Sequence, residues 1–197
     1  MSDGFPALDG AHSPEGHRVS WRSWDGAHRE DASVRWDNEA YTAQVQMQGA
    51  RCEYVLRLGP DWRVRQLLLF RDLDEPDLWL ANDGAGRWGE MQGARRPELD
   101  GAVDVHVAAS PFVHTPAIRR LGLAVGGRAE VRSVMVDPET LEARAVDHVY
   151  LRTANDRWVH TDHAGAETLL TVDGVGVVIE AEGVYTRDDA RAVGETG

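Results

Sequence analysis

The sequence contains no lysine, although it has 21 basic residues, so every one of them is an arginine. Without a lysine amine, the chain cannot form a Schiff base with a carbonyl substrate, and it cannot supply the lysine of a P-loop. Each basic side chain is instead a planar guanidinium group, which suits bidentate binding of an oxyanion. The missing lysines therefore exclude two classes of chemistry and leave anion recognition open.

Cysteine is almost as rare, because Cys52 is the only one. No intramolecular disulfide can form, which suits a reducing compartment. The first residues, MSDGFPALDGAHSPEGHRV, lack the apolar region of a secretory signal. No apolar run approaches the roughly 20 residues that a membrane helix needs. We therefore expect a cytoplasmic protein without stable membrane insertion.

Positive charge is also scarce overall, since the formal net charge is −12. Such a balance argues against binding to nucleic acid or to anionic membrane surfaces, because that binding rests on positive charge. The sequence has no nucleophile elbow, no dinucleotide-binding fingerprint and no CxxC pair. We expect no nucleic-acid partner and no cofactor, and the sequence leaves the oligomeric state open.

A length of 197 residues fits one domain, or at most two small ones. The polar, glycine-rich ends predict a mobile N-terminal segment over residues 1–17 and a mobile tail over residues 188–197. No proline- or serine-rich linker divides the part between them. We predict a single β domain over residues 18–187.

Alternation of apolar and polar residues with a period of two dominates this domain. In AYTAQVQMQ, for example, Tyr41, Ala43, Val45 and Met47 face one way, and the threonine and glutamines face the other. The predicted strands are AYTAQVQMQ, CEYVLRL, WRVRQLLLF, DLWLAN, RWGEM, AVDVHV, AEVRSVMV, EARAVDHVYLR, RWVHTD, ETLLTV and GVVIEAE.

Turn signals lie between these strands, at Asp83-Gly84, Gly126-Gly127, Asn155-Asp156 and Asp173-Gly174. They predict consecutive antiparallel hairpins. So many strands in one small domain must protect their edges, which closure or strong curling does best. We predict an all-β fold in which a strongly curved antiparallel sheet forms a barrel or half-barrel and encloses a cavity for a ligand.

One or two short helices are expected beside this sheet. The best candidate is TPAIRRLG, with Thr115 as N-cap, Pro116 as the first helical residue and Gly122 as the stop. Immediately before it, the strand AVDVHV places Asp104 and His106 on one face, roughly 7 Å apart. An aspartate beside a histidine can orient an imidazole for general-base catalysis, or the two can simply form a satisfied polar pair.

The two arginines of this helix point in different directions. Arg119 or Arg120 can bind an anionic headgroup through its guanidinium fork, while the other can pair with a carboxylate of the fold. The sequence leaves open which arginine does which.

Four stretches in this order carry a family resemblance: PDWRVRQL, DGAGRW, PELDGAVDVHV and SPFVHTPAIRRL. Together they resemble the putative glycolipid-binding family of bacterial proteins, over most of the chain from about Val19 to Arg187. The resemblance implies an all-β, curved antiparallel sheet akin to the half-barrels of lipoprotein carriers. It also implies binding of a glycolipid or another amphiphile. The family's motif positions fall on Trp62, Arg63, Arg65, Trp88, Leu99, Asp100, Gly101, Asp104, Thr115, Ile118, Arg119, Arg120 and Leu121.

The chain departs from the family pattern at several polar positions. His106 stands where the family usually has aspartate, His114 where it has asparagine, and His148 where glutamine is common. Ala102 replaces a frequent cysteine. These departures imply that the pocket outline persists while its polar lining, and with it the preferred ligand, differs.

A cluster of His160, Asp162 and His163 has the residue types of a zinc site. On a strand, however, His160 and His163 would face opposite sides, and no thiolate supports them, so we expect no metal here. Most of the seven tryptophans are expected in the core, while Trp62 and Trp88 can line the cavity.

Three functions remain open from the sequence. In the first, which we favour, the sheet binds a glycolipid-like amphiphile without catalysis, using residues drawn from the motifs and the departures. These are Trp62, Arg63, Trp88, Asp104, His106, His114, Arg119 and Arg120. In the second, Asp104, His106 and His114 form the active site of an enzyme for a small or lipid-linked substrate. In the third, the domain has no ligand, and its charged motif residues pair with one another to hold the fold.

Overall fold

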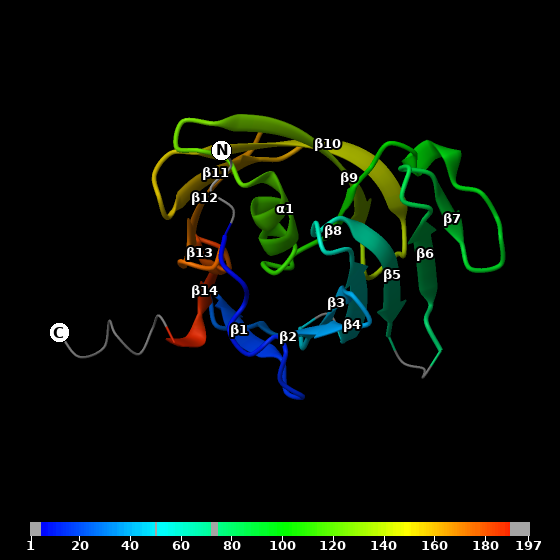
Figure 1. The fold of residues 1–197 in the computed structure, drawn as a ribbon, viewed down its shortest axis with the longest axis horizontal. Coiled ribbons are helices and arrows are strands. Elements are labelled where there is room, and N and C mark those ends of the chain that lie inside the picture. The colour runs from blue at the N-terminus through cyan, green and yellow to red at the C-terminus, as the bar shows by residue number, and fades with distance from the viewer. Residues whose placement is uncertain (1–4, 50, 72–74, 190–197) are drawn as a thin grey trace.

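The computed structural model describes residues 5–49, 51–71 and 75–189 (Figure 1). Fourteen strands form one sheet in the order β7-β6-β5-β4-β3-β2-β1-β14-β13-β12-β11-β10-β9-β8. The first half of the chain gives β1 (His17–Ser23), β2 (Arg29–Asp37), β3 (Ala40–Met47), β4 (Cys52–Leu58), β5 (Val64–Phe70), β6 (Leu78–Asn82), β7 (Trp88–Glu90) and β8 (Asp104–Val107). The second half gives β9 (Arg128–Val136), β10 (Ala143–Arg152), β11 (Arg157–Thr161), β12 (Glu167–Val172), β13 (Val178–Ala181) and β14 (Tyr185–Arg187).

The sheet consists of two meanders that meet where β1 pairs with β14. It curls around on itself, and β7 and β8 remain as its two ends (Figure 1). The predicted curved all-β sheet is therefore confirmed. Of the two forms predicted, the closed barrel is wrong and the open, half-barrel form is correct.

Ten of the eleven predicted strand segments contain one whole strand, and AEVRSVMV lacks only the first residue of β9. CEYVLRL and ETLLTV coincide with β4 and β12. The sequence missed β1, β2 and β14. In β1 and β2 the inward positions include Ser23 and Glu30 beside small Ala32, so the contrast between the two faces is weak. Strand β14 is only three residues long. Where polar residues lie on the buried face, the alternation of apolar and polar residues that identifies a strand is lost.

All neighbouring strands pair antiparallel except β8 and β9, which are parallel. The prediction of uninterrupted antiparallel hairpins is wrong at this one place. The reason is the helix α1 (His114–Leu121), which carries the chain from the end of β8 back toward its start. A parallel pair requires such a crossover connection.

The helix begins two residues earlier than the sequence predicted, at His114 instead of Pro116. Its N-cap is Val113, without a side-chain hydrogen bond, so the prediction of Thr115 as N-cap is wrong. Pro116 is tolerated because it lies in the first turn, where no helical acceptor is available for its backbone nitrogen. The predicted stop at Gly122 is confirmed, since this residue has the left-handed φ of 50°. A 3-10 helix, η1 (Pro97–Leu99), is a further short helix in the described part of the chain.

Helix α1 lies inside the curve of the sheet, between the arm of β10 to β12 and the arm of β1 to β4 (Figure 1). Its residues from His114 to Arg119 are all buried. Ile118 packs with Val131, Tyr150 and Trp158 in one apolar cluster, and a larger cluster fills the space toward β3, β4 and β5. The concave face therefore holds a helix and side chains where the sequence predicted an enclosed cavity. The two cavities of the candidate site, described below, lie beside the β8–α1 connection.

The described part of the segment before β1 contacts the domain, and the mobility of residues 1–17 stays a prediction. Leu8 and Ala11 are buried, and the carbonyl of Pro6 accepts a hydrogen bond from Arg119 at 2.8 Å. From residue 190 onward, the predicted tail lies outside the described residues. Among the described residues, no helix has the length and apolar character needed to cross a membrane.

Candidate ligand-binding site

The connection between β8 and α1 shapes the candidate site. After Val107 the chain turns through Ala109, whose φ is 63°, and the backbone nitrogen of Ser110 donates to the carbonyl of Val107 at 3.2 Å. The backbone nitrogen of Phe112 donates to the buried carboxyl of Glu30 at 3.0 Å. These contacts fix the turn, so that His106 on β8 and His114 on α1 face each other.

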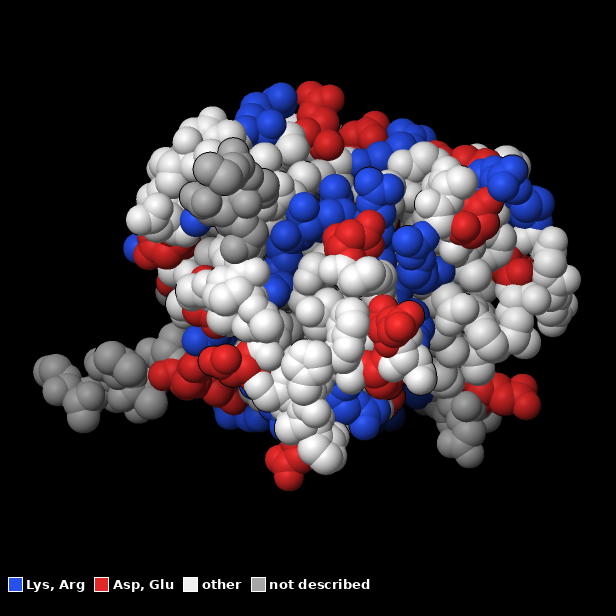
Figure 2. All heavy atoms as spheres, in the orientation of Figure 1, with Lys and Arg blue, Asp and Glu red and all other residues white. Residues whose placement is uncertain are grey.

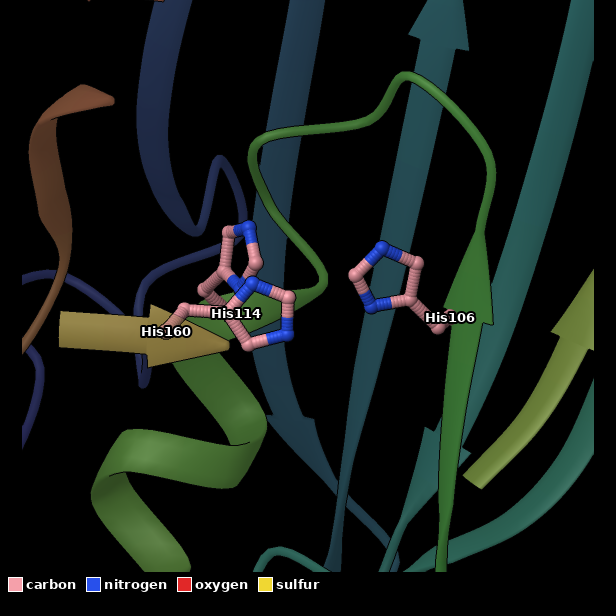
Figure 3. Close-up of side chains that lie close together, drawn as sticks. All are labelled: His106, His114 and His160. Atoms are coloured by element: carbon pink, nitrogen blue, oxygen red, sulfur yellow. The ribbon is translucent and has the colours of Figure 1, made fainter. Parts of the chain in front are cut away.

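Four imidazole rings gather at this turn. His106 lies 5.3 Å from His114, 4.9 Å from His148 on β10 and 5.7 Å from His160 on β11, measured between ring centroids. His114 and His160 are 4.6 Å apart, and His148 and His160 are 5.0 Å apart. Figure 3 shows His106 reaching from its strand toward His114 and His160. We call His106, His114, His148 and His160 the histidine cluster.

Hydrogen bonds orient three of these rings. Nδ1 of His114 lies 2.9 Å from the hydroxyl of Tyr150, and Nε2 of His160 lies 3.1 Å from Nδ1 of His148. Nε2 of His148 is buried without a hydrogen-bond partner among the described residues. His106 is half-buried and contacts its neighbours through its ring alone.

Burial keeps these rings neutral. Loss of hydration lowers the pKa of His106, His114 and His148, and lowers that of His160 to about 4. Neighbouring histidines lower the pKa of His106 and His114 further, because two imidazolium ions would repel one another. Neutral imidazoles carry one N–H donor and one nitrogen lone pair each, so the cluster can bind polar groups or a metal ion.

The cluster opens into a cavity of about 190 Å³, which we call the histidine cavity. Its walls include His106, His114 and His160, together with Asp162 and Ser110. A second cavity, of about 250 Å³, lies against the same turn and shares Ala109 and Tyr185 with the first. We call it the apolar cavity, because Met47, Ala108, Ala109, Pro138 and Tyr185 form much of its wall.

Glu30 lies at the wall of the apolar cavity and is buried. One carboxyl oxygen accepts the Phe112 N–H, and the other has no partner among the described residues. Burial raises its pKa to about 8, and no arginine of the described residues forms an ion pair with it. Near pH 7 this side chain is therefore mainly a neutral acid that can donate a hydrogen bond.

The acid–base arrangement considered from the sequence is only partly assembled. Asp104 is buried and forms a bidentate ion pair with Arg120, with nitrogen–oxygen distances of 2.5 and 3.1 Å. Both carboxyl oxygens of Asp104 therefore accept hydrogen bonds from Arg120 of α1. The side chain of His106, two residues later, faces the other histidines of the cluster. The structure brings His106 and His114 together and holds Asp104 apart from them with Arg120.

Arg119 also serves the fold. Its guanidinium donates to the carbonyls of Val175 and Pro6 and lies over the ring of Trp62, 4.4 Å from the ring centroid. Trp62 in turn stacks on Tyr41 with 4.3 Å between ring centroids. This stack lies away from both cavities and ties the N-terminal segment to α1.

The remaining predicted site residues lie elsewhere. Arg63 is exposed, pairs with Asp61 at 3.3 Å, and borders a separate cavity of about 170 Å³ near the turn at Gly84. Trp88 is fully buried, and its indole nitrogen donates to the carbonyl of Ala102 at 2.9 Å. Neither residue reaches the β8–α1 turn.

Among the site residues that the sequence did not predict are Glu30, His148 and His160. His160 was set aside because strand alternation separates it from His163. His163, however, follows the end of β11 at Thr161, and its ring lies 6.3 Å from that of His148. The sequence signal for His148 was its departure from the family pattern, and Glu30 carried no signal.

Charge on the face seen in Figure 2 is mixed. Arginine side chains gather over the middle of this face, and acidic side chains lie among and around them. The net charge of −12 is thus unevenly spread, and a local basic area exists on an acidic protein.

Comparison with known proteins supports a family assignment. The family model described as "Putative glycolipid-binding" matches residues 18–187. A crystal structure of a DUF1089 family protein from Pseudomonas aeruginosa is similar at 29% sequence identity, with a TM-score of 0.69. The similarity covers 89% of this chain and 94% of that one. The search of curated proteins gave no match.

Proposed function

Because the chain belongs to the putative glycolipid-binding family, we propose that it binds a small amphiphile at the β8–α1 turn. The apolar part of this ligand occupies the apolar cavity, and its polar part occupies the histidine cavity. The observation that carries this proposal is that two cavities of different character share the side chains of Ala109 and Tyr185.

The walls of the two cavities match the two ends of an amphiphile. Met47, Ala108 and Pro138 offer apolar surface, and burying an apolar chain there gains about 25 cal/mol per Å². On the other side, neutral His106, His114 and His160 offer donors and acceptors for hydroxyl groups. Specific ligand sites combine apolar walls with a few polar groups in this way.

Cavity size limits the ligand. Drug-sized ligands occupy cavities of roughly 300–1,000 Å³, whereas the two cavities here measure about 250 and 190 Å³. These sizes fit one short acyl chain and one sugar-sized headgroup better than a lipid with two long chains. Octyl glucoside has this form and is a suitable probe.

The test is a titration of the purified protein with octyl glucoside, followed by tyrosine and tryptophan fluorescence and by native mass spectrometry. We expect saturable 1:1 binding below the micelle concentration. In Ala108→Phe the new ring fills the apolar cavity, so we expect affinity to fall at least about tenfold, or about 1.4 kcal/mol.

A matched control is Ala94→Phe, which adds the same ring at an exposed position beyond β7. The control should bind as the unmodified protein does. Equal affinity of Ala108→Phe and Ala94→Phe would place any binding elsewhere, and the absence of saturable binding would overturn the proposal.

A further inference from the structure

The histidine cluster has a property that hydrogen bonding to an amphiphile does not use. His106, His114 and His160 each offer one possible ligand nitrogen, and these nitrogens all lie within 4.8 Å of one another. The three residues come from β8, α1 and β11, so the fold rather than local sequence brings them together (Figure 3). From this geometry we propose that His106, His114 and His160 form a binding site for Zn²⁺, with a fourth coordination position open to the histidine cavity.

The spacing suits an ion after a small closure. Zinc–nitrogen bonds of about 2.0–2.1 Å in a tetrahedral arrangement place the nitrogens about 3.4 Å apart. Nitrogens within 4.8 Å of one another reach that spacing by ring movements of about 1 Å. Two of the rings, His114 and His160, are buried, and the half-buried His106 has no side-chain hydrogen bond to the described residues that such a movement would break.

The supporting contacts are those of metal-binding histidines. The Tyr150 hydroxyl holds Nδ1 of His114, which leaves Nε2 of that ring for an ion. His160 is held by His148 at 3.1 Å. Ligating histidines usually bond their second ring group to a neighbour in this way, which fixes ring orientation.

A second observation points to an absent ligand. Nε2 of His148, next to the three proposed ligands, is buried without a partner among the described residues. Buried polar atoms in native proteins are nearly always satisfied, so an exception calls for an ion or a water molecule nearby.

The chemistry of the donors selects the metal class. Imidazole suits Zn²⁺, Cu²⁺ and Ni²⁺, while Mg²⁺ and Ca²⁺ require oxygen ligands. The one cysteine, Cys52, is not among the residues that line the histidine cavity. Three neutral histidines with an open fourth position form a set that zinc sites use. Asp162 and Ser110 border the same cavity, where a bound water or a ligand oxygen would meet the ion.

The test begins with protein purified in the presence of a chelator and then freed of it. Titration with ZnCl₂ should show one site by isothermal calorimetry. Substitution with Co²⁺ should give the intense visible absorption of a tetrahedral ion, and X-ray absorption should report imidazole ligands. Fluorescence titration with octyl glucoside, run with and without zinc, separates this site from the amphiphile site, since either can fail alone.

Variants make the assignment specific. His114→Gln and His160→Gln should each weaken zinc binding at least 100-fold, while His12→Gln, an exposed histidine near Trp36, should leave it unchanged. Tyr150→Phe removes only the group that orients His114 and should weaken binding about 10- to 100-fold. Circular dichroism checks that each variant is folded.

Two outcomes would overturn the proposal. One is a Co²⁺ spectrum of an octahedral ion without imidazole ligands in the unmodified protein, a measurement that requires no variant to fold. The other is equal zinc affinity in His12→Gln and in folded His114→Gln.

Discussion

Strand β8 places two polar side chains on the same face, two residues apart, and their surroundings are opposite. Asp104 is buried against Arg120 in a paired, hydrogen-bonded contact. His106 faces three other neutral rings and a cavity. The same comparison holds along α1, where His114 at the start belongs to the cluster and Arg120 near the end belongs to the ion pair.

This difference shows that the segment from β8 through α1 combines an ion pair that holds the fold with neutral histidines that border a cavity. At one end of this segment, Asp104 and Arg120 pair with each other, and Asp104 lines none of the cavities described above. We call this the closed end. At the other end of the segment, which we call the open end, His106 and His114 border the histidine cavity, and His148 of β10 beside them has a buried nitrogen without a partner among the described residues. Binding sites commonly retain such unsatisfied or strained groups, and the rest of the fold must offset their cost.

The largest expected effect comes from breaking the closed end. Arg120→Met leaves Asp104 buried without a partner, so we expect a loss of about 3–5 kcal/mol in the free energy of unfolding. Urea denaturation measures it. The control is Arg132→Met, which breaks an exposed pair with Asp147 and should cost about 0.2–1 kcal/mol.

A double variant sharpens this result. Replacing both partners, Asp104→Leu with Arg120→Met, removes the unpaired charge as well as the pair. We expect it to recover most of the lost stability, because apolar replacements of buried ion pairs are often near neutral. If Arg120→Met and Arg132→Met lower the free energy of unfolding by the same amount, the Asp104–Arg120 pair stabilises the fold no more than a surface ion pair does.

A second prediction compares the two buried carboxyl groups, Asp104 with its arginine and Glu30 without one. The pKa of Glu30 rises from 4.5 to about 8 on folding. The native state therefore holds a proton that the unfolded state releases, and the stability that Glu30 contributes is lost as the pH rises from about 4.5 through 8. Relative to Glu30→Gln, the unmodified protein should lose about 2–4 kcal/mol between pH 5 and pH 9.

Urea denaturation at the two pH values tests this prediction. The exposed Glu167→Gln is the control for removing one negative charge, and its stability should follow that of the unmodified protein. A Glu30→Gln variant that keeps the same pH dependence as the unmodified protein would show that Glu30 is not buried as a neutral acid.

Much of the fold could be predicted because its strands alternate strongly. Val45, Tyr54 and Leu56 face the core from strands whose other face is polar, so the period of two is plain. The parallel pairing of β8 with β9 could not be predicted, because a strand's pattern shows which face is buried but not which strand lies beside it.

The site could be predicted only where it is local in sequence. His106 and His114 share one segment, and their closeness follows from the turn between them. His148 and His160 join them only through the register of β10 and β11, which sets Tyr150 opposite His160 and so brings His148 to the same face. That register is a tertiary property, and Glu30 reaches the turn from the more distant β2.

The smallest expected effect on stability is that of His106→Gln, at the open end of the segment. His106 is half-buried, neutral and without a hydrogen bond among the described residues, so His106→Gln removes no satisfied polar contact. We expect the free energy of unfolding of the metal-free protein to change by less than about 1 kcal/mol, as for most substitutions outside satisfied networks. Urea denaturation in the presence of a chelator measures this change, and the same variant should lose zinc binding.

Together, His106→Gln and Arg120→Met separate the two ends of the segment, since Arg120→Met should lower the free energy of unfolding and leave the histidine ligands in place. A loss of several kcal/mol in His106→Gln would instead mean that the cluster holds the fold, and the division of this segment into a closed and an open end would be wrong.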